Sequence, residues 1–554
     1  MAGEESSAQV ASGVYARKAT GLVREGGAWS VLIYNINFVS IGLMTLFAML
    51  LIPAFYPGSN IQTSFVLALL IVLPTSLVFA FFAAAMPRSG GDYVYVSRVL
   101  GPSWGMMSNW NQTVWWILYG GVPSAFFAYY GLTPLFRTLG VMTGRTGLIT
   151  FGDKLSTPTG AFISGTILII VLVAIFSLGL NVYFRIQNVL FAVAMLGAFI
   201  TIFLLLAKSH ADFQSAFNST LAPISGQTDT FAAVMKSAKG GGFVTAPFSL
   251  YWTLIPITWI YLELVFNQSS AYIGGEVKRP GKVQVWSMPF AAIFSVAVAM
   301  LTVWVFQKTA GTTFLGALSF DNGATLKFST APLYTEVAAY TTGSTIIGFL
   351  IAFGFLFWSY AWLPGQIINA SRNLLAYGID GVGPSWLGKV NERFHTPINA
   401  LVVMGLGSIA ALFFYTRPDS PFKTLVGIFG FILSFILTSI AAIFLPYRQK
   451  AIFESSPVNW RIGKIPVVSI VGALSVLVCG LMAWVYLHDP LSGLSWTPSG
   501  HKGGGILFHS KTFDMFLLNL VIFVSGLVIY FVARAYRARE GVNLDATFKE
   551  IPIE

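Results

Sequence analysis

The chain has 554 residues, of which 55% are hydrophobic and only 10% charged, and its mean hydropathy is +0.74. A soluble protein carries about 25% charged residues, so this composition excludes a soluble fold and predicts an all-helical protein that crosses a lipid bilayer many times. The net charge of +11 comes without a cluster of Lys and Arg among exposed aromatic residues, so nucleic acid is not an expected partner. One cysteine and five scattered histidines form no metal-binding or catalytic pattern. We therefore expect neither a metal or other cofactor nor an enzyme activity.

A helix needs about 20 apolar residues to cross a bilayer. Twelve such spans are predicted, at 29–52, 62–86, 104–136, 160–182, 185–207, 250–273, 286–307, 344–371, 398–416, 424–446, 464–487 and 513–534. If the N-terminus is cytoplasmic, 20 of the 32 Lys and Arg residues fall on the cytoplasmic side, as the positive-inside rule favours. We therefore expect a multi-pass protein of the cell membrane with both termini in the cytoplasm.

These spans also predict the organisation of the chain. The expected parts are a cytoplasmic segment at 1–28, a ten-helix core at 29–446, two further helices within 464–534 and a cytoplasmic tail at 535–554. The long loop at 308–343 is expected to contain a short helix within 331–340 that covers the outer side of the core.

The first span contains polar residues that a plain membrane helix avoids. Asn35, Asn37 and Ser40 interrupt its apolar run, and Gly42 follows. An unwound turn here would free backbone groups, which is tolerable only where a cavity or a solute satisfies them. The alternative is a tilted helix whose small and polar residues pack on neighbouring helices.

The sixth span holds Glu263, the only acidic residue within the predicted membrane core, and the polar run 267–270 follows it. A carboxylate at that depth costs several kcal/mol. Three interpretations are open. Glu263 takes part in proton or cation coupling, it pairs with the ammonium group of a substrate, or it is a neutral, hydrogen-bonded structural acid.

The two interrupted spans lie five spans apart, as the corresponding helices of a five-plus-five inverted repeat would. Paired interruptions of this kind indicate the midplane binding site of a transporter. Amides exposed at a helix start attract a carboxylate, and exposed carbonyl groups attract an ammonium group or a metal cation. The aromatic residues Trp259, Phe266 and Trp358 are candidate gates, with ordinary packing as the alternative.

Three stretches carry a resemblance to a known family. They are PRSGGDYVYVSRVLGPSWG at 87–105, GGEVKRPGKV at 274–283 and SRNLLAYGIDGVGPSWLGKVNERFHTPINAL at 371–401. The first is similar to the P-K/R-S-G-G-x-Y-x-Y loop of the amino acid–polyamine–organocation (APC) transporters, and the other two are similar to that family's E-x-x-x-P turn and S-R-x-x-x-A-x-x-x-D-G segment. The resemblance implies the leucine-transporter-type fold, with helices 1–5 and 6–10 as inverted repeats, two peripheral helices, and helices 1 and 6 unwound at the midplane.

The resemblance also implies a function, namely secondary transport of amino acids or related small amines by alternating access. The substrate would lie at the unwound centres, against Asn37, Val39, Ser40, Ile41, Gly42, Leu262, Glu263, Phe266 and Asn267. Of the glycines in the family's first-helix motif only Gly42 is kept, which puts the usual pose of an α-amino acid in doubt. The position of the family's sixth-helix aromatic gate falls on Leu262, so gating would pass to Phe266 or another aromatic residue.

The coupling ion is open between H⁺, Na⁺ and none. A coupling lysine found in some family members would fall near Ala194, where this chain has no lysine. A sodium site between helices 1 and 8 would use Ser359. Glu263 could take the place of either the coupling lysine or the sodium site. The alternatives to a coupled transporter are an exchanger or facilitator without ion coupling and a transporter-like solute sensor. In either case we expect a monomer or a homodimer whose partners are the lipid bilayer and a small molecule.

Overall fold

The structure is a computed structural model that describes residues 21–417, 420, 424–494 and 510–548. Its α-helices are α2 (Ala28–Val39), α3 (Ile41–Phe55), α4 (Ile61–Ala85), α5 (Asp92–Val99), α6 (Pro102–Phe126), α7 (Thr133–Thr143), α8 (Thr146–Leu155), α9 (Pro158–Ser177), α10 (Leu180–Leu206), α11 (His210–Ser225), α12 (Thr230–Gly240), α13 (Leu250–Leu254), α14 (Ile257–Leu264), α15 (Pro280–Thr309), α16 (Thr312–Asp321), α17 (Tyr334–Tyr340), α18 (Thr345–Trp358), α19 (Trp362–Ile379), α20 (Ile398–Tyr415), α21 (Val426–Arg448), α22 (Lys450–Ser455), α23 (Val467–His488), α24 (Ser510–Arg539) and α25 (Leu544–Thr547). The remaining elements are a π-helical turn η1 (Phe127–Leu132), the 3₁₀ turns η2 (Ser269–Tyr272), η3 (Gly274–Glu276) and η4 (Ser385–Gly388), and an antiparallel hairpin of β1 (Arg461–Ile462) and β2 (Ile465–Pro466).

Ten helical stretches in the described residues are long and apolar enough to cross a membrane. Each of the twelve predicted ranges coincides with one helix or with helices in line, so the predicted all-helical, multi-pass fold is confirmed. Two of the predicted spans, the third and the sixth, are not among these ten stretches. In the third, buried polar residues such as Asn109 and Gln112 interrupt the apolar run of α6. The sixth is divided into the shorter elements α13, α14 and η2. The count of twelve spans stays a prediction.

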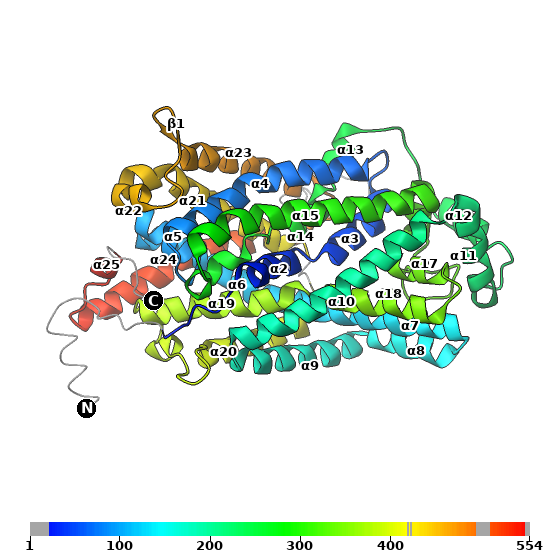
Figure 1. The fold of residues 1–554 in the computed structure, drawn as a ribbon, viewed down its shortest axis with the longest axis horizontal. Helices are drawn as coiled ribbons and strands as arrows, with labels where there is room; N and C mark the ends of the chain where they lie inside the picture. The colour runs from blue at the N-terminus through cyan, green and yellow to red at the C-terminus, as the bar shows by residue number, and fades with distance from the viewer. Residues whose placement is uncertain (1–20, 418–419, 421–423, 495–509, 549–554) are drawn as a thin grey trace.

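The long helices run along one axis of the molecule (Figure 1). We call its two ends the α5 end, where α5, α22 and α25 lie, and the α17 end, where α11, α12 and α17 lie. The α2–α3 stretch is mostly buried, whereas α23 and α24 leave most of their surface exposed. The first helix therefore occupies the centre of the bundle, as a helix that carries a binding site must.

Two long loops fold into short helices at the α17 end. Residues 208–249 contain α11 and α12, and Ser209 and Asp212 form a capping box at the start of α11. Residues 308–343 contain α16 and α17. The predicted short helix within 331–340 is confirmed by α17.

Candidate functional site

The first helix is interrupted at a single residue. Between Val39 and Ile41, Ser40 has a φ of 46°, in the left-handed region that few residues other than glycine adopt. The Ser40 hydroxyl donates a hydrogen bond to the carbonyl oxygen of Trp358 at 2.8 Å and accepts one from the Leu43 amide at 3.4 Å. Its side chain therefore caps α3 and also ties the first helix to the eighth.

Gly42 allows Trp358 to pack directly on the first helix. A Cβ atom on residue 42 would lie 2.5 Å from Cβ and Cγ of Trp358, closer than non-bonded carbon atoms approach. The indole nitrogen of Trp358 donates to the carbonyl oxygen of Ala194 on α10 at 3.3 Å. The predicted gate residue Trp358 thus joins the first, fifth and eighth helices.

The second break lies beside the first. α14 ends at Leu264, and a turn over 265–268 leads into η2. The side-chain amide of Asn35 in α2 donates to Ser270 Oγ at 2.9 Å, and the Ser270 backbone amide donates to Asn35 Oδ1 at 2.9 Å. The two interrupted helices predicted from sequence therefore contact each other directly.

Phe266 lies in the turn of the second break, surrounded by aromatic rings. Its ring centroid is 5.1 Å from that of Phe38 in α2 and 5.3 Å from that of Phe431 in α21. Trp116 in α6 and Trp362 in α19 lie at 5.8 and 6.0 Å. We call these five residues the aromatic cluster. It fills the space beside the breaks with apolar surface, which suits contact with an apolar side chain.

The other predicted aromatic gate lies closer to the α17 end. The indole nitrogen of Trp259 donates to the Tyr56 hydroxyl at 2.9 Å, and its ring is 5.7 Å from that of Phe47. Three further predicted site residues are buried in the apolar core: Val39, Ile41 and Leu262.

The fully buried polar side chains of the sixth and eighth helices include Glu263, Asn267 and Gln366. Within the described part of the chain, neither carboxyl oxygen of Glu263 has a hydrogen-bond partner, and neither polar atom of the Asn267 and Gln366 amides has one. An unpaired buried polar atom costs about 1–3 kcal/mol, so such atoms are rare in proteins. A polar solute or a cation would find donor and acceptor groups here that the described residues do not use.

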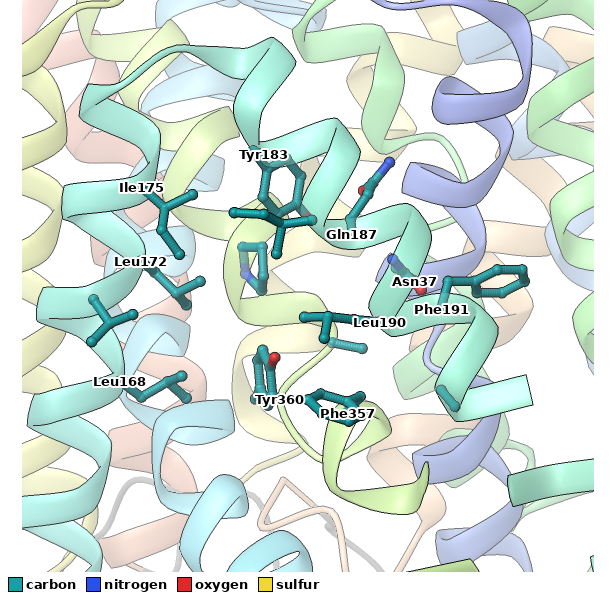
Figure 2. Close-up of a pocket in the computed structure, with 15 residues that line it drawn as sticks. Asn37, Leu168, Leu172, Ile175, Tyr183, Gln187, Leu190, Phe191, Phe357 and Tyr360 are labelled. Carbon is teal, nitrogen blue, oxygen red and sulfur yellow. The ribbon is translucent and has the colours of Figure 1, made fainter. Parts of the chain in front are cut away.

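A cavity of about 220 Å³ lies beside the first break (Figure 2). Its polar groups come from Asn37, Tyr183, Gln187 and Tyr360. Its apolar wall consists of Leu168, Val171, Leu172, Ile175, Ile186, Leu190, Phe191, Ala194, Phe357, Ala361 and Pro364. The predicted site residue Asn37 thus faces this cavity, whereas its neighbour Phe38 belongs to the aromatic cluster.

The eighth helix is also interrupted, between Trp358 and Trp362. The Ser359 hydroxyl donates to the Leu356 carbonyl oxygen at 2.7 Å, and a Cβ atom on Gly131 of η1 would lie 2.4 Å from it. This hydroxyl therefore lies against η1, and its role in cation coupling stays a prediction. The sequence did not indicate this break because the run 345–358 is almost wholly apolar and aromatic residues continue it.

At the α5 end, the start of the first helix is clamped to the segment after the second break. Arg372 Nε and Nη2 lie 2.8 and 2.9 Å from the two carboxylate oxygens of Glu276, and both side chains are 2% exposed. The Gly26 amide donates to the Glu276 carbonyl oxygen at 2.8 Å, and the Lys278 amide donates to that of Gly26 at 2.8 Å. These bonds tie the start of the first helix to the segment after the second break and to the eighth helix.

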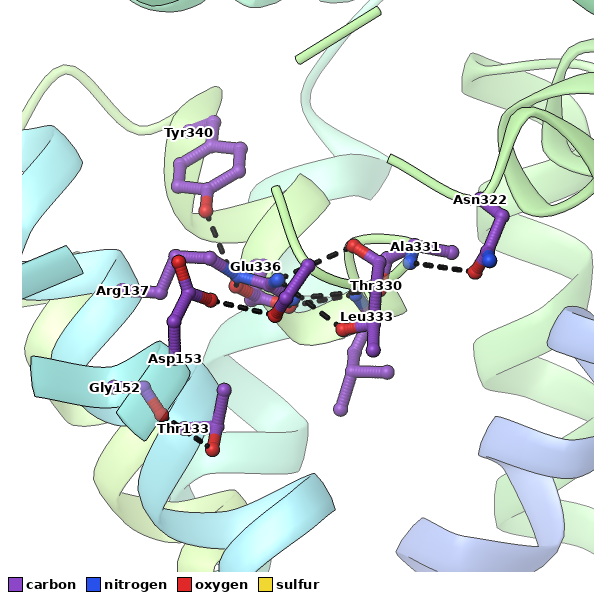
Figure 3. Close-up of polar contacts among 11 residues, drawn as sticks. Thr133, Arg137, Gly152, Asp153, Asn322, Thr330, Ala331, Leu333, Glu336 and Tyr340 are labelled. Carbon is purple, nitrogen blue, oxygen red and sulfur yellow. Dashed lines mark hydrogen bonds and ion pairs between the residues drawn. The ribbon is translucent and has the colours of Figure 1, made fainter. Parts of the chain in front are cut away.

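At the α17 end, a second buried ion pair holds the loop that carries α17 (Figure 3). Arg137 Nε and Nη2 each lie 2.6 Å from a carboxylate oxygen of Glu336, which also accepts from the Tyr340 hydroxyl at 3.2 Å. Arg137 Nη1 donates to the Thr330 carbonyl oxygen at 3.2 Å. Sequence reasoning missed this pair because the two residues are 199 positions apart.

A family profile described as "Amino acid permease" matches residues 27–498, which include both breaks and the aromatic cluster. The chain belongs to the amino acid permease family. The predicted resemblance to APC transporters is therefore confirmed. As a permease, the protein transports amino acids, and it is a multi-pass protein of the plasma membrane.

Individual relatives of the permease are distant. The chain is 25% identical over 410 residues to the branched-chain amino acid permease BcaP of Lactococcus lactis subsp. cremoris, an alignment that covers 72% of this chain and 77% of the relative. It is 22% identical over 514 residues to BcaP of Bacillus subtilis, covering 92% and 93% of the two chains. An uncharacterized transporter, R00093 of Rhizobium meliloti, is 28% identical over 207 residues, covering 36% and 39%.

Proposed function

We propose that this permease moves branched-chain or similarly apolar amino acids across the cytoplasmic membrane by alternating access, with the substrate bound where the first and sixth helices break. The observation that carries the proposal is the direct contact of the two interrupted helices, through Asn35 and Ser270, beside the aromatic cluster. Two relatives aligned over most of their length are branched-chain amino acid permeases. The proposal places the α5 end in the cytoplasm.

The chemistry of the breaks suits the two ends of such a substrate. The amino end of α3 begins at Ile41 and Gly42 and favours a carboxylate, while the carbonyl ends of α2 and α14 favour an ammonium group. The aromatic cluster offers apolar contact to the side chain. Because a buried ion pair ties segments together at each end of the molecule, alternating access would require these ties to open one end at a time.

We further propose that Glu263 participates in cation coupling, by taking up a proton or by stabilising a bound cation. Support comes from its complete burial and from the absence of a hydrogen-bond partner for either carboxyl oxygen among the described residues. An acidic residue inside a membrane protein is functional more often than structural. The second candidate function, exchange without ion coupling, requires only the same breaks and no role for Glu263.

The test is uptake of radiolabelled amino acids into proteoliposomes under imposed proton or sodium gradients. We expect leucine, isoleucine and valine to be concentrated, with little uptake of lysine or glutamate. Glu263→Gln should abolish gradient-driven accumulation while sparing exchange, whereas Glu392→Gln, at an exposed loop position, should behave as wild type. Normal accumulation by Glu263→Gln would refute the coupling role. Preferential uptake of charged amino acids would refute the proposed substrate class.

A further inference from the structure

The buried carboxyl groups of the described chain differ in their partners. Three pair with arginine: Glu276 with Arg372, Glu336 with Arg137, and Asp380 with Arg98. Asp92 and Asp489 are equally buried, at 0% exposure, but the groups that bond them are hydroxyls and amides. An ionised carboxylate buried without a cation is strongly disfavoured, so these two groups are sensitive to protonation.

Asp92, at the α5 end, binds the half of the sixth helix that follows the break. Its Oδ2 accepts a hydrogen bond from Ser108 Oγ at 2.6 Å, and its Oδ1 accepts from the Asn109 amide at 2.7 Å and from the Tyr272 hydroxyl at 3.2 Å. Tyr272 lies in η2, and a Cβ atom on Gly91 would lie 2.6 Å from its ring. The carboxyl group therefore lies in a tight joint between α5, α6 and the sixth helix.

Asp489, next to the last residue of α23, binds the half of the sixth helix that precedes the break. Its Oδ1 accepts from the Tyr56 hydroxyl at 2.6 Å and from the Leu491 amide at 2.9 Å. Its Oδ2 accepts from the Thr258 hydroxyl of α14. Tyr56 ends the first helix, so Asp489 joins the first and sixth helices on the far side of the breaks from Asp92.

We propose that Asp92 and Asp489 are proton-binding sites, one for each half of the sixth helix, and that protonation of each favours closure of its own end of the permease. A proton from the solution on that side adds to a carboxylate oxygen and leaves a neutral acid, which the closed joint accommodates. When the end opens, water reaches the group and solvates the carboxylate, so the proton is released to the same side. The inference rests on the proposed alternating access.

The sign of the pH effect follows from burial. Burial raises the pKa of Asp92 from 3.8 to about 6, although hydrogen bonds from Ser108 and Asn109 oppose it, and raises the pKa of Asp489 from 3.8 to about 6 against bonds from Thr258 and Tyr56. In the open, hydrated form the pKa returns toward its usual value. Closure is therefore favoured below about pH 6 and loses this support as the pH rises through 6. A difference of about two pH units corresponds to about a hundredfold change in the ratio of closed to open ends.

The other titratable groups near these carboxyls are mainly phenols. Around Asp92 the phenols are those of Tyr272 in η2 and Tyr377 in α19. The nearby residues of α6 and α21 are neutral: Ser108, Asn109, Gln112 and Ser434. The charged residue of α5, Arg98, is paired with Asp380. Around Asp489 they are Tyr56, Tyr251, Tyr486 and the neighbouring His488, whose ring stacks on Trp484. His488 is the one imidazole among these groups, so it needs its own control.

pH-difference infrared spectroscopy of the reconstituted protein tests proton binding without any transport. We expect the wild type to show the carbonyl band of a protonated carboxyl that disappears with a midpoint near pH 6. Asp92→Asn and Asp489→Asn should each remove about half of the component that titrates near pH 6, and the double variant should remove all of that component, while any band of the buried Glu263 remains. Tyr272→Phe, which deletes one donor to Asp92, should raise the midpoint of that component by about one pH unit. A component that still titrates near pH 6 in the double variant, or a wild-type midpoint near pH 4 for both components, would overturn the proposal.

Leucine exchange in vesicles of known orientation, with the pH varied on one side at a time, tests the link to closure. Asp92→Asn should abolish the dependence on pH at the α5 side only, and Asp489→Asn the dependence at the α17 side only, while His488→Gln retains both. Wild-type pH profiles in both aspartate variants would contradict the link. If the wild type does not exchange leucine, the proposed function fails, and the infrared titration still decides whether the two protons bind.

Discussion

Replacing Arg372 by methionine measures how strongly the α5 end is held closed. The residue makes two charged hydrogen bonds, of 2.8 and 2.9 Å, to a glutamate that is itself 2% exposed. Removing one partner of a buried pair costs about 3–5 kcal/mol, because the remaining charge is left unpaired. If the loss falls on the closed form, the closed-to-open ratio falls by a factor of at least about one hundred. Substituting Glu276→Leu as well should restore most of the loss, because apolar residues often replace a buried pair at little cost.

The assay is hydrogen exchange of the backbone around residues 25–28 and 274–278, together with the thermal unfolding temperature. Arg372→Met should lower the unfolding temperature and speed exchange in both segments, because the Gly26 and Lys278 amide bonds depend on the same closure. Arg393→Met, at an exposed position, serves as the control and should change neither. Unchanged exchange in Arg372→Met, or a double variant as unstable as the single one, would show that the pair does not hold this end.

Three other substitutions test separate parts of the structure. Gly42→Ala places a Cβ atom 2.5 Å from the facing tryptophan, so overpacking of about 1–3 kcal/mol should abolish leucine uptake, whereas Gly27→Ala, which meets no atom within 4 Å, should not. Phe266→Ala removes the central ring of the aromatic cluster and should raise the KM for leucine uptake at least tenfold, with a smaller change for alanine. Arg137→Met should lose about 3–5 kcal/mol and make the loop 322–340 sensitive to limited proteolysis, whereas the exposed Arg145→Met should not.

The helical fold was predictable because the bilayer imposes length and composition on every spanning helix. The interruptions of the first and sixth helices were predictable for the same reason. Burying the polar side chains of Asn35 and Asn267 at that depth costs free energy unless another group binds them. The break after Trp358 was not predictable, because no polar run accompanies it. The confinement of the first break to Ser40 was also not predictable, since it depends on a bond to a carbonyl group 318 residues away.

The candidate site was predictable only in outline. Glu263 stood out as a lone acid, but its lack of a hydrogen-bond partner among the described residues is a property of the folded core. The packing of Trp358 on Gly42, and the assembly of rings around Phe266, join helices far apart in sequence, which no local pattern encodes. Asp92 and Asp489 carry no signal in the sequence because they lie outside the predicted membrane core, where an acidic residue is ordinary.

A structure of the permease with saturating L-leucine tests the central claim most directly. We predict ligand density between the break at Ser40 and the break at 265–268, with the leucine side chain against Phe266 and its charged groups against the exposed helix ends. Density confined instead to the cavity lined by Asn37 and Phe191, in a protein that transports leucine, would contradict the claim that the two breaks form the substrate site.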